Sequence, residues 1–334
     1  MSTIAIFSAS NQEMRAYLDS RLQDIDWYEK EIQEYDPSEI IDRASIEIVS
    51  SFTDSEWTSD TIALFPNLRA IATQSTGYDH IDIEYCKKQG IAVYNVPAYG
   101  AITVAEYTWA LLLALARRIP EGEQAVQADG NFSRRGSKEL QGFDLAGKSI
   151  AVIGVGKIGH NVIHRANAFG MKIFAYDLYP DRALEDEYHL TWASSVAEAV
   201  RSSDIITIHL PYNKHTHHLI NQEIFQAMNP QSIFINTSRG EVVDSFALKE
   251  ALDKGILAQV ALDVLEDEYA LESGEPGKMA TLNQELIADP RVLVTPHNAF
   301  NTKEALERIY QATVESIQSL LDKQAKEDDV RRVV

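Results

Sequence analysis

Residues 149–177, SIAVIGVGKIGHNVIHRANAFGMKIFAYD, contain an apolar run, a glycine-rich turn, a helical pattern and a second apolar run that ends on an aspartate. Gly154, Gly156 and Gly159 in the turn have the spacing GxGxxG. The first glycine allows a tight turn, the second lets the backbone approach a pyrophosphate, and the third lets the helix pack against the strand. Because the pattern follows a strand, opens a helix and is completed by Asp177, it predicts a dinucleotide site.

The aspartate at the end of this stretch predicts which dinucleotide binds. Asp177 can accept hydrogen bonds from both ribose hydroxyls, and its charge would repel a 2′-phosphate. The next residues, Leu178 and Tyr179, supply no cation to offset that repulsion. The sequence therefore predicts NAD as the cofactor, with its pyrophosphate on the N–H groups at the start of the helix.

Similar apolar runs alternate with helical patterns through most of the chain. Besides the two runs above, they lie at 3–8, 69–75, 91–96, 204–210, 232–237, 258–263 and 291–296. Runs this apolar are typical of parallel strands that helices bury on both faces. The pattern predicts a doubly wound α/β architecture. One helix over 102–127 is longer and more apolar than a typical crossover helix, so it needs cover from the core or from a second subunit.

The composition limits the classes of function. The chain has 334 residues, 45% of them hydrophobic and 24% charged, which is typical of a globular protein of about two domains. A formal charge of −20 repels phosphate backbones and anionic lipids, so nucleic acid and membranes are not expected partners. We find no signal peptide, and the longest apolar stretch, 109–116, is shorter than a membrane span. We expect a cytoplasmic protein in which the single cysteine, Cys86, is buried.

Three polar side chains follow later strands of the predicted sheet. Arg239, Asp263 and His297 stand at or just past the ends of their apolar runs, where ligands of open α/β sheets bind. Each alone has a simpler explanation: a surface arginine, a helix-capping aspartate or a loop histidine. Together, an arginine that can hold a carboxylate and a histidine that can transfer a proton near neutral pH suit hydride transfer between nicotinamide and a carbonyl carbon. No metal is required.

The other histidines have simpler interpretations. His209, followed by Pro211, ends a strand and is expected to line the cofactor site. His215, His217 and His218 lie in a polar connection without the spacing of metal ligands, so we expect them on the surface.

The stretch ALDVLEDEYALESGEP, 261–276, has six carboxylates. A cluster of acids between structured elements is usually a solvated surface. That interpretation fits Glu266, Asp267, Glu272 and Glu275. Asp263 differs because it ends a strand, and the residues alone do not decide the role of Glu268.

Six ordered motifs are spread over nearly the whole chain. They are STGYDHID at 75–82, NVPAYGAITVAEY at 95–107, GVGKIG at 154–159, NTSRGEVVD at 236–244, ALDVLEDE at 261–268 and TPHNAF at 295–300. They resemble the D-isomer-specific 2-hydroxyacid dehydrogenases, and within that family the D-lactate dehydrogenase branch.

This resemblance implies roles for particular residues. It implies the catalytic set Arg239, Glu268 and His297, in which Glu268 is the acid five residues after the aspartate of the LDV motif. The implied substrate-binding residues are Thr76 and Gly77, through their backbone N–H groups, Tyr99, and Phe300, which stands where the branch often has tyrosine. Asp263 matches the position that contacts the nicotinamide carboxamide. With the turn residues, the expected cofactor-binding set is Gly154, Gly156, Lys157, Ile158, Gly159, Asp177, His209, Pro211, Thr237 and Asp263.

The resemblance also implies the architecture. We expect two doubly wound parallel-sheet domains, Rossmann-like and flavodoxin-like, with a cleft between them that closes on the substrate. Residues 1–101 and 300–334 would form the substrate domain, and residues 102–299 the NAD-binding domain. The helix near 102–119 corresponds to the family's dimer interface, which predicts a homodimer.

The activity expected from the motifs is the reversible, NAD-dependent interconversion of a small 2-oxo acid and its D-2-hydroxy acid, pyruvate and D-lactate first. Glyoxylate, hydroxypyruvate or a bulkier 2-oxo acid is the alternative within this class. The formate branch is disfavoured because it pairs its histidine with glutamine, where this chain has Glu268. In a different class, the carboxy-terminal binding protein corepressors resemble this fold and act as NAD-dependent scaffolds.

Overall fold

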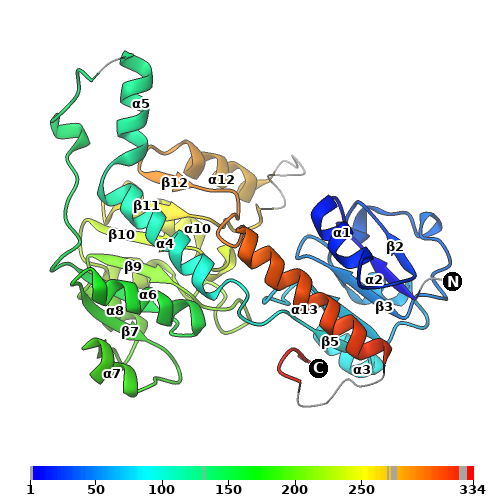
Figure 1. Ribbon diagram of the computed structural model, residues 1–334. Coiled ribbons are helices and arrows are strands. Elements are labelled where there is room, and N and C mark those ends of the chain that lie inside the picture. The colour runs from blue at the N-terminus through cyan, green and yellow to red at the C-terminus, as the bar shows by residue number, and fades with distance from the viewer. Residues whose placement is uncertain (1–2, 131, 269–270, 272–276, 323–328) are drawn as a thin grey trace. The chain divides into compact units, whose positions relative to one another are not determined.

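The computed structural model describes residues 3–130, 132–268, 271, 277–322 and 329–334. The chain divides into two compact units, unit 1 with Met1–Tyr99 and Thr302–Val334, and unit 2 with Gly100–Asn301. Each unit is built on a sheet whose neighbouring strands are all parallel, with helices on its faces (Figure 1). The predicted α/β class is therefore confirmed. No helix in the described part of the chain combines the length and the apolar character needed to cross a membrane.

Unit 1 has a five-stranded sheet in the order β2-β1-β3-β4-β5. Its strands are β1 (Ile4–Ile6), β2 (Ile25–Trp27), β3 (Ile48–Ser51), β4 (Ala70–Thr73) and β5 (Ala92–Tyr94). Its helices are α1 (Gln12–Asp19), α2 (Ser59–Ala63), α3 (Ile83–Gln89) and α13 (Lys303–Leu321), with short 3₁₀ turns η1 (Ile32–Glu34) and η2 (Pro37–Glu39).

The C-terminal part of the chain completes unit 1. Helix α13 packs against β4 and α1, and the Arg69 guanidinium donates to the carbonyl oxygen of Leu320 at 2.9 Å. Beyond it, the Val333 N–H donates to the Val93 carbonyl oxygen at 2.7 Å, so the last residues pair with the edge strand β5. Cys86 is buried as predicted, and burial raises the pKa of its thiol to about 11.

Unit 2 has a seven-stranded sheet in the order β12-β11-β10-β9-β6-β7-β8. Its strands are β6 (Ser149–Ile153), β7 (Lys172–Tyr176), β8 (Thr191–Trp192), β9 (Ile205–Ile208), β10 (Ser232–Asn236), β11 (Leu257–Leu262) and β12 (Val292–Val294). Its helices are α4 (Ala101–Ala116), α5 (Ile119–Asp129), α6 (Lys157–Ala168), α7 (Ala183–Tyr188), α8 (Val196–Arg201), α9 (Gln222–Ala227), α10 (Ser245–Asp253) and α12 (Lys278–Ala288), with 3₁₀ turns η3 (Lys138–Leu140) and η4 (Gly240–Val242).

The strand order of unit 2 positions a ligand site. Helices α4 and α6 contact one face of the sheet, and α8, α10 and α12 lie with the hydrophobic cluster of the other face. The order of the strands reverses between β6 and β9, which are neighbours in the sheet. Ligands of open α/β sheets bind at such a switch point, beyond the carboxyl ends of the strands.

The prediction of one helix over 102–127 is wrong, because the segment breaks between α4 and α5. Arg118 adopts a left-handed conformation with φ +53°. Pro120 has no N–H to donate to Ala116, and its ring would clash with that carbonyl group in a continuous helix. The Ala116 carbonyl oxygen accepts the N–H of Phe143 instead, at 3.0 Å. Strands β2, β3 and β8 were also not predicted. The apolar residues of IEIV at 46–49, which run into the start of β3, are a signal that could have revealed that strand.

Candidate active site

The glycine-rich turn lies between β6 and α6, at the switch point of the unit 2 sheet. Gly154 has φ +92°, and a Cβ atom there would lie 2.5 Å from the carbonyl oxygen of His209. A Cβ at Gly159 would lie 2.1 Å from the carbonyl oxygen of Gly154. A Cβ at Gly156, in contrast, would meet no atom within 4 Å. Close backbone contacts therefore require glycine at Gly154 and Gly159, whereas Gly156 leaves open space at the start of α6.

Asp177 is tied to this turn by its carboxylate. Oδ2 accepts the N–H of Val155 at 2.7 Å, and Oδ1 accepts the N–H of Tyr179 at 2.9 Å. Each carboxylate oxygen has a second lone pair, so the group can still accept a hydroxyl. The fixed carboxylate beside the glycine turn fits the adenosine ribose of NAD.

His209 has a buried nitrogen that fits a ligand at the same edge. The residue is 8% exposed, and burial lowers the pKa of its imidazole to about 3, so the ring is neutral. Its Nε2 lies 2.9 Å from the Thr207 hydroxyl, while Nδ1 has no hydrogen-bond partner within the described residues. Buried polar atoms are normally hydrogen-bonded, so Nδ1 of His209 is suited to a hydrogen bond with a bound ligand. The residues present at this edge therefore fit a dinucleotide.

The remaining predicted cofactor residues have varied environments. Lys157 and Pro211 are exposed, and Ile158 is half-buried at the start of α6. Thr237, after β10, is buried and its hydroxyl lies 2.9 Å from the hydroxyl of Thr108 on α4.

His297 and Glu268 form a close pair. His297 Nδ1 lies 2.6 Å from Glu268 Oε1, with the two side chains 35% and 39% exposed. Because an ionised carboxylate only accepts, Nδ1 donates in this contact, which leaves Nε2 for a reacting group. Burial lowers the pKa of His297, but the hydrogen bond and charge of Glu268 outweigh burial, and the net pKa is raised above its ordinary value. The imidazole is thus stabilised in its protonated form.

Arg239 follows β10 and lies within electrostatic range of this pair, since its charge acts to lower the pKa of His297. The turn that carries it is pinned by Asn236, whose Nδ2 donates to the Arg239 carbonyl oxygen at 2.8 Å and whose Oδ1 accepts the Ser238 N–H at 3.0 Å. Unit 2 therefore brings the three predicted catalytic residues to the carboxyl ends of β10, β11 and β12.

Asp263 holds the turn that presents His297. Its side chain is buried, and burial raises the pKa of its carboxyl group. Oδ1 accepts the Thr295 hydroxyl at 2.6 Å and the Asn298 N–H at 2.9 Å, and Oδ2 accepts the Ala299 N–H at 2.8 Å. The His297 N–H also donates to the Asp263 carbonyl oxygen at 2.8 Å. Its predicted contact with a nicotinamide carboxamide stays a prediction.

The acidic stretch differs from its predicted form at Glu266. Its side chain is only 11% exposed, and its Oε1 lies 2.6 Å from Nε2 of His218. The prediction of a solvated Glu266 is therefore wrong, because the loop folds back onto distant segments of unit 2. The His218 side chain is 34% exposed, so it lies at the surface as predicted, but it is paired with Glu266. Asp267 is exposed as predicted. Glu272 and Glu275 lie outside the described residues.

Gly240, directly after Arg239, is a site residue absent from the predicted set. A Cβ atom there would lie 2.1 Å from the carbonyl oxygen of Leu265 and 2.3 Å from the backbone nitrogen of Glu266. Only glycine lets the turn of Arg239 lie this close to the loop that carries Glu268. The signal in the sequence is the RG dipeptide at the end of a strand run, which marks a close backbone approach.

The predicted substrate-binding residues lie partly in unit 1. The Thr76 hydroxyl donates to the Val96 carbonyl oxygen at 2.7 Å. Within the described residues, no hydrogen bond uses the backbone N–H of Thr76 or of Gly77. The Tyr99 side chain is buried in unit 1, and Phe300 is half-buried in unit 2.

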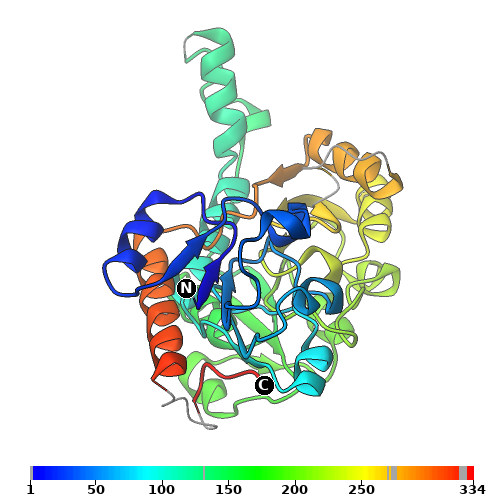
Figure 2. The same ribbon diagram turned by 90° about the vertical axis from the view of Figure 1, so that its right-hand side faces the viewer.

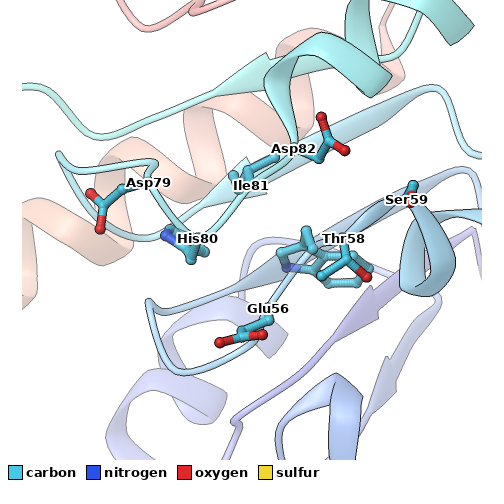
Figure 3. A pocket seen from close by; sticks show the side chains of 8 residues that line it. Glu56, Thr58, Ser59, Asp79, His80, Ile81 and Asp82 are labelled. Carbon is cyan, nitrogen blue, oxygen red and sulfur yellow. The ribbon is translucent and has the colours of Figure 1, made fainter. Parts of the chain in front are cut away.

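Unit 1 also has a cavity of about 350 Å³ that none of the predicted site residues line. Its lining comes from the start of α2 and the segment before α3, and Figure 3 shows Glu56 and Thr58 on one side, with Asp79, His80 and Asp82 on the other. Three carboxylates make it unsuited to an anionic substrate. No group of three or more His, Cys, Asp or Glu side chains among the described residues could hold a metal ion, here or elsewhere.

Comparison with known proteins decides the family. Residues 109–299 match the family model of the D-isomer specific 2-hydroxyacid dehydrogenase, NAD binding domain. The chain belongs to this family. It is an NAD-dependent dehydrogenase, and the predicted family and cofactor are confirmed.

Relatives within the 2-hydroxyacid dehydrogenases carry different substrate names. A D-3-phosphoglycerate dehydrogenase of Methanocaldococcus jannaschii is 35% identical over 85% of this chain, and the match spans 51% of that relative, about half its length. A glyoxylate reductase of Aeropyrum pernix is 35% identical over 77% of this chain and 75% of its own. The crystal structure of a D-lactate dehydrogenase from Aquifex aeolicus, complexed with NAD and lactic acid, is 33% identical over 99% of both chains, with a TM-score of 0.91.

Proposed function

We propose that this 2-hydroxyacid dehydrogenase reduces a small 2-oxo acid to its D-2-hydroxy acid, with pyruvate as the preferred substrate. The observation that carries the proposal is the 2.6 Å contact between His297 and Glu268 within electrostatic range of Arg239. The likeness to a D-lactate dehydrogenase over 99% of both chains supports pyruvate and D-lactate as the substrate pair.

Arg239 is the proposed carboxylate ligand. Its guanidinium can donate two parallel, charge-assisted hydrogen bonds to a carboxylate, which orients the substrate as well as binding it. This cationic group matters because the chain carries a net charge of −20 and repels an anionic substrate elsewhere. The backbone N–H groups of Thr76 and Gly77 in unit 1 are the proposed further donors.

His297 is the proposed proton donor and acceptor. When bound, NADH would supply the hydride for the reduction. Protonated His297 gives the proton on Nε2 to the carbonyl oxygen of the substrate. In the oxidation, neutral His297 takes the proton of the hydroxyl group back. Glu268 contributes by holding the ring through Nδ1 and by stabilising the imidazolium form.

Glyoxylate, hydroxypyruvate and bulkier 2-oxo acids form the alternative substrate class. The 35% identical glyoxylate reductase of Aeropyrum pernix supports glyoxylate in place of pyruvate. We propose that Tyr99 and Phe300 contact the substrate's side chain and so decide between these acids.

A substrate panel tests the proposal. Oxidation of NADH would be measured with pyruvate, glyoxylate, hydroxypyruvate and a branched 2-oxo acid, followed by chiral analysis of the product. We expect the highest kcat/KM with pyruvate and a product of D configuration. A higher kcat/KM with glyoxylate would move the assignment to the alternative. Tight NADH binding without turnover of any acid would contradict the enzyme function and favour an NAD-dependent scaffold.

We further propose a homodimer built on α4 and α5. Figures 1 and 2 show α5 projecting from the rest of unit 2. Its Ile119 and Val126 are 57% and 40% exposed, and burying such apolar side chains against a second copy would stabilise them. Light scattering should give the mass of two chains, and Ile119→Glu with Val126→Glu should give one. A wild-type protein of single-chain mass would contradict this proposal.

A further inference from the structure

Glu266 is a nearly buried acid of unit 2 that the proposed chemistry does not use. Its Oε1 contacts Nε2 of His218 at 2.6 Å, and its Oε2 accepts the N–H of Ser245, the first residue of α10, at 3.3 Å. Its backbone carbonyl oxygen accepts Nδ2 of Asn283, on α12, at 2.8 Å. A carboxylate in this position cannot turn away without leaving a buried charge unpaired, so the residue is held in one place.

His218 belongs to a segment that runs beside the turn after Arg239. It adopts a left-handed conformation with φ +49°, and its N–H donates to the Glu241 carbonyl oxygen at 2.9 Å. Two residues later, Ile220 forms a parallel bridge with Val243. The backbone of His218 is thus fixed to the chain that follows Arg239.

The same turn also touches the Glu266 backbone directly. Gly240 packs so closely on the Leu265–Glu266 peptide that a Cβ atom would lie 2.1 Å from the Leu265 carbonyl oxygen. Arg239 precedes this contact by one residue, and Glu268 follows Glu266 by two. The backbone segments that carry Arg239 and Glu268 are therefore in direct contact at the Leu265–Glu266 peptide.

We propose that the Glu266–His218 pair is a positioning device, which holds the loop of Glu268 in register with the turn of Arg239 so that Glu268 meets His297. Glu266 acts through Glu268 and does not touch the reacting atoms. Within the described residues of the loop, the Glu268 carboxylate also accepts the Leu265 N–H at 3.3 Å, but this contact is internal to the loop and does not tie it to the turn of Arg239. The inference deepens the proposed function and rests on it for the role of His297.

Loss of the pair should be visible at His297. The charged groups that face its imidazole are Glu268, Arg239 and Asp263. A loosened Glu266 loop would lengthen the contact with Glu268, while Arg239 and Asp263 keep their own anchors in the Asn236 and Thr295 turns. The group that stabilises the imidazolium would be weakened and the pKa of His297 would fall.

The experiment is an NMR titration of the His297 imidazole in the full-length protein without cofactor, assigned from the spectrum of His297→Gln. We compare the wild type with Glu266→Ala and with His218→Asn, because asparagine tolerates the left-handed backbone and shortens the side chain. We expect each variant to lower the His297 pKa by roughly half a unit to one unit. The alkaline limb of kcat/KM for 2-oxo acid reduction should move down by the same amount, with NADH affinity unchanged.

Three further variants separate position from charge. Asp267→Asn removes an equal charge one residue nearer to Glu268, at an exposed residue whose φ of +53° asparagine also adopts, and should leave the His297 pKa unmoved. Glu266→Gln keeps a hydrogen-bonding side chain of the same length and should show less than half of the alanine shift. The double variant Glu266→Ala with His218→Asn should shift no further than either single variant.

An unchanged His297 pKa in folded Glu266→Ala and His218→Asn proteins would overturn the proposal. An equal shift in Asp267→Asn would also overturn it, because charge alone would then act. If Glu266→Ala does not fold, the His297 pKa of the His218→Asn protein decides the test, because His218 is the more exposed residue of the pair. A wild-type protein that turns over no 2-oxo acid would refute the proposed function instead, and the cofactor-free titration would still decide on the pair.

Discussion

His297 Nδ1 lies 2.6 Å from Glu268 Oε1, although 29 residues separate the two in the chain. The histidine follows β12, and the acid lies on the loop after β11. Burial favours neutral imidazole, while the hydrogen bond and charge of Glu268 favour imidazolium and prevail, so the pKa of His297 is raised. The pair therefore keeps a proton available for reduction at a higher pH than an isolated histidine would.

Glu268→Gln should move the alkaline limb of 2-oxo acid reduction to lower pH. Reduction needs protonated His297, so the rate falls as pH rises through the pKa of His297, and removing the Glu268 charge lowers that pKa. We expect a shift of roughly one unit in the pH profile of kcat/KM with pyruvate and NADH. Asp267→Asn, which removes a neighbouring exposed charge, is the control. A limb that stays in place would remove Glu268 from its proposed role.

Arg239→Lys should weaken substrate use and leave cofactor binding intact. Lysine keeps the charge but loses the planar pair of donors that a carboxylate accepts. We expect kcat/KM for pyruvate to fall by about a hundredfold, with the Kd of NADH unchanged, measured by steady-state kinetics and cofactor fluorescence. Arg201→Lys, at an exposed arginine on α8, should change neither. A loss confined to NADH affinity would argue against carboxylate binding by Arg239.

Asp177→Asn should reduce the preference for NADH over NADPH. The substitution removes the negative charge that repels a 2′-phosphate. It also replaces one of the two carboxylate oxygens, which in the wild type accept the N–H groups of Val155 and Tyr179, with an amide NH₂ that cannot accept. We expect NADH to bind about tenfold more weakly, while NADPH gains relative to it. Titration calorimetry of both cofactors measures the ratio, with Asp186→Asn on the exposed face of α7 as the control. An unaltered ratio of the NADH and NADPH affinities would mean that residues other than Asp177 exclude the 2′-phosphate of NADPH.

Gly240→Ala should lower both stability and activity. The added Cβ would lie 2.1 Å from the Leu265 carbonyl oxygen, so the turn of Arg239 and the loop of Glu268 must separate. We expect the free energy of unfolding to fall by about 1–3 kcal/mol, with a larger proportional loss of kcat/KM. Gly122→Ala in α5, where the Cβ meets no atom within 4 Å, should stabilise by up to about 1 kcal/mol. Denaturant unfolding of both variants checks this, and a Gly240→Ala protein as stable and active as the wild type would disprove the close packing.

Much of the cofactor turn could be predicted because its requirements are local. Gly154, Gly159 and Asp177 lie within one strand–turn–helix–strand unit, where Gly159 packs on the Gly154 carbonyl group and Asp177 accepts the Val155 N–H. The close approach of the His209 carbonyl group to Gly154, in contrast, comes from outside the unit. Nine of the strand runs were similarly recognisable, since strands buried on both faces are continuously apolar. The short strands β2, with the sequence IDW, and β8, with the sequence TW, lack that signal, because neither is a continuous apolar run and neither is fully buried.

The proposed catalytic pair is specified less locally. Arg239, Asp263 and His297 could be chosen from their places at strand ends, but nothing in the spacing of the acidic stretch separates Glu268 from its neighbours, and only the family resemblance selected it. The physical basis lies in the tertiary structure: Asp263 fixes the turn of His297, and the loop places Glu268 against its ring.

By itself, the sequence determined the parallel α/β fold, the glycine turn and the choice of NAD, because these follow from local backbone geometry and from the apolar pattern of single strands. Only the tertiary structure decided that Asp267 is exposed while the neighbouring Glu266 is nearly buried. Glu266 meets His218 across 48 residues of chain, and Gly240 lets the turn of Arg239 pack against the Glu266 backbone. A contact of this kind depends on how loops from different strands fold back on one another, which no periodicity or local propensity specifies.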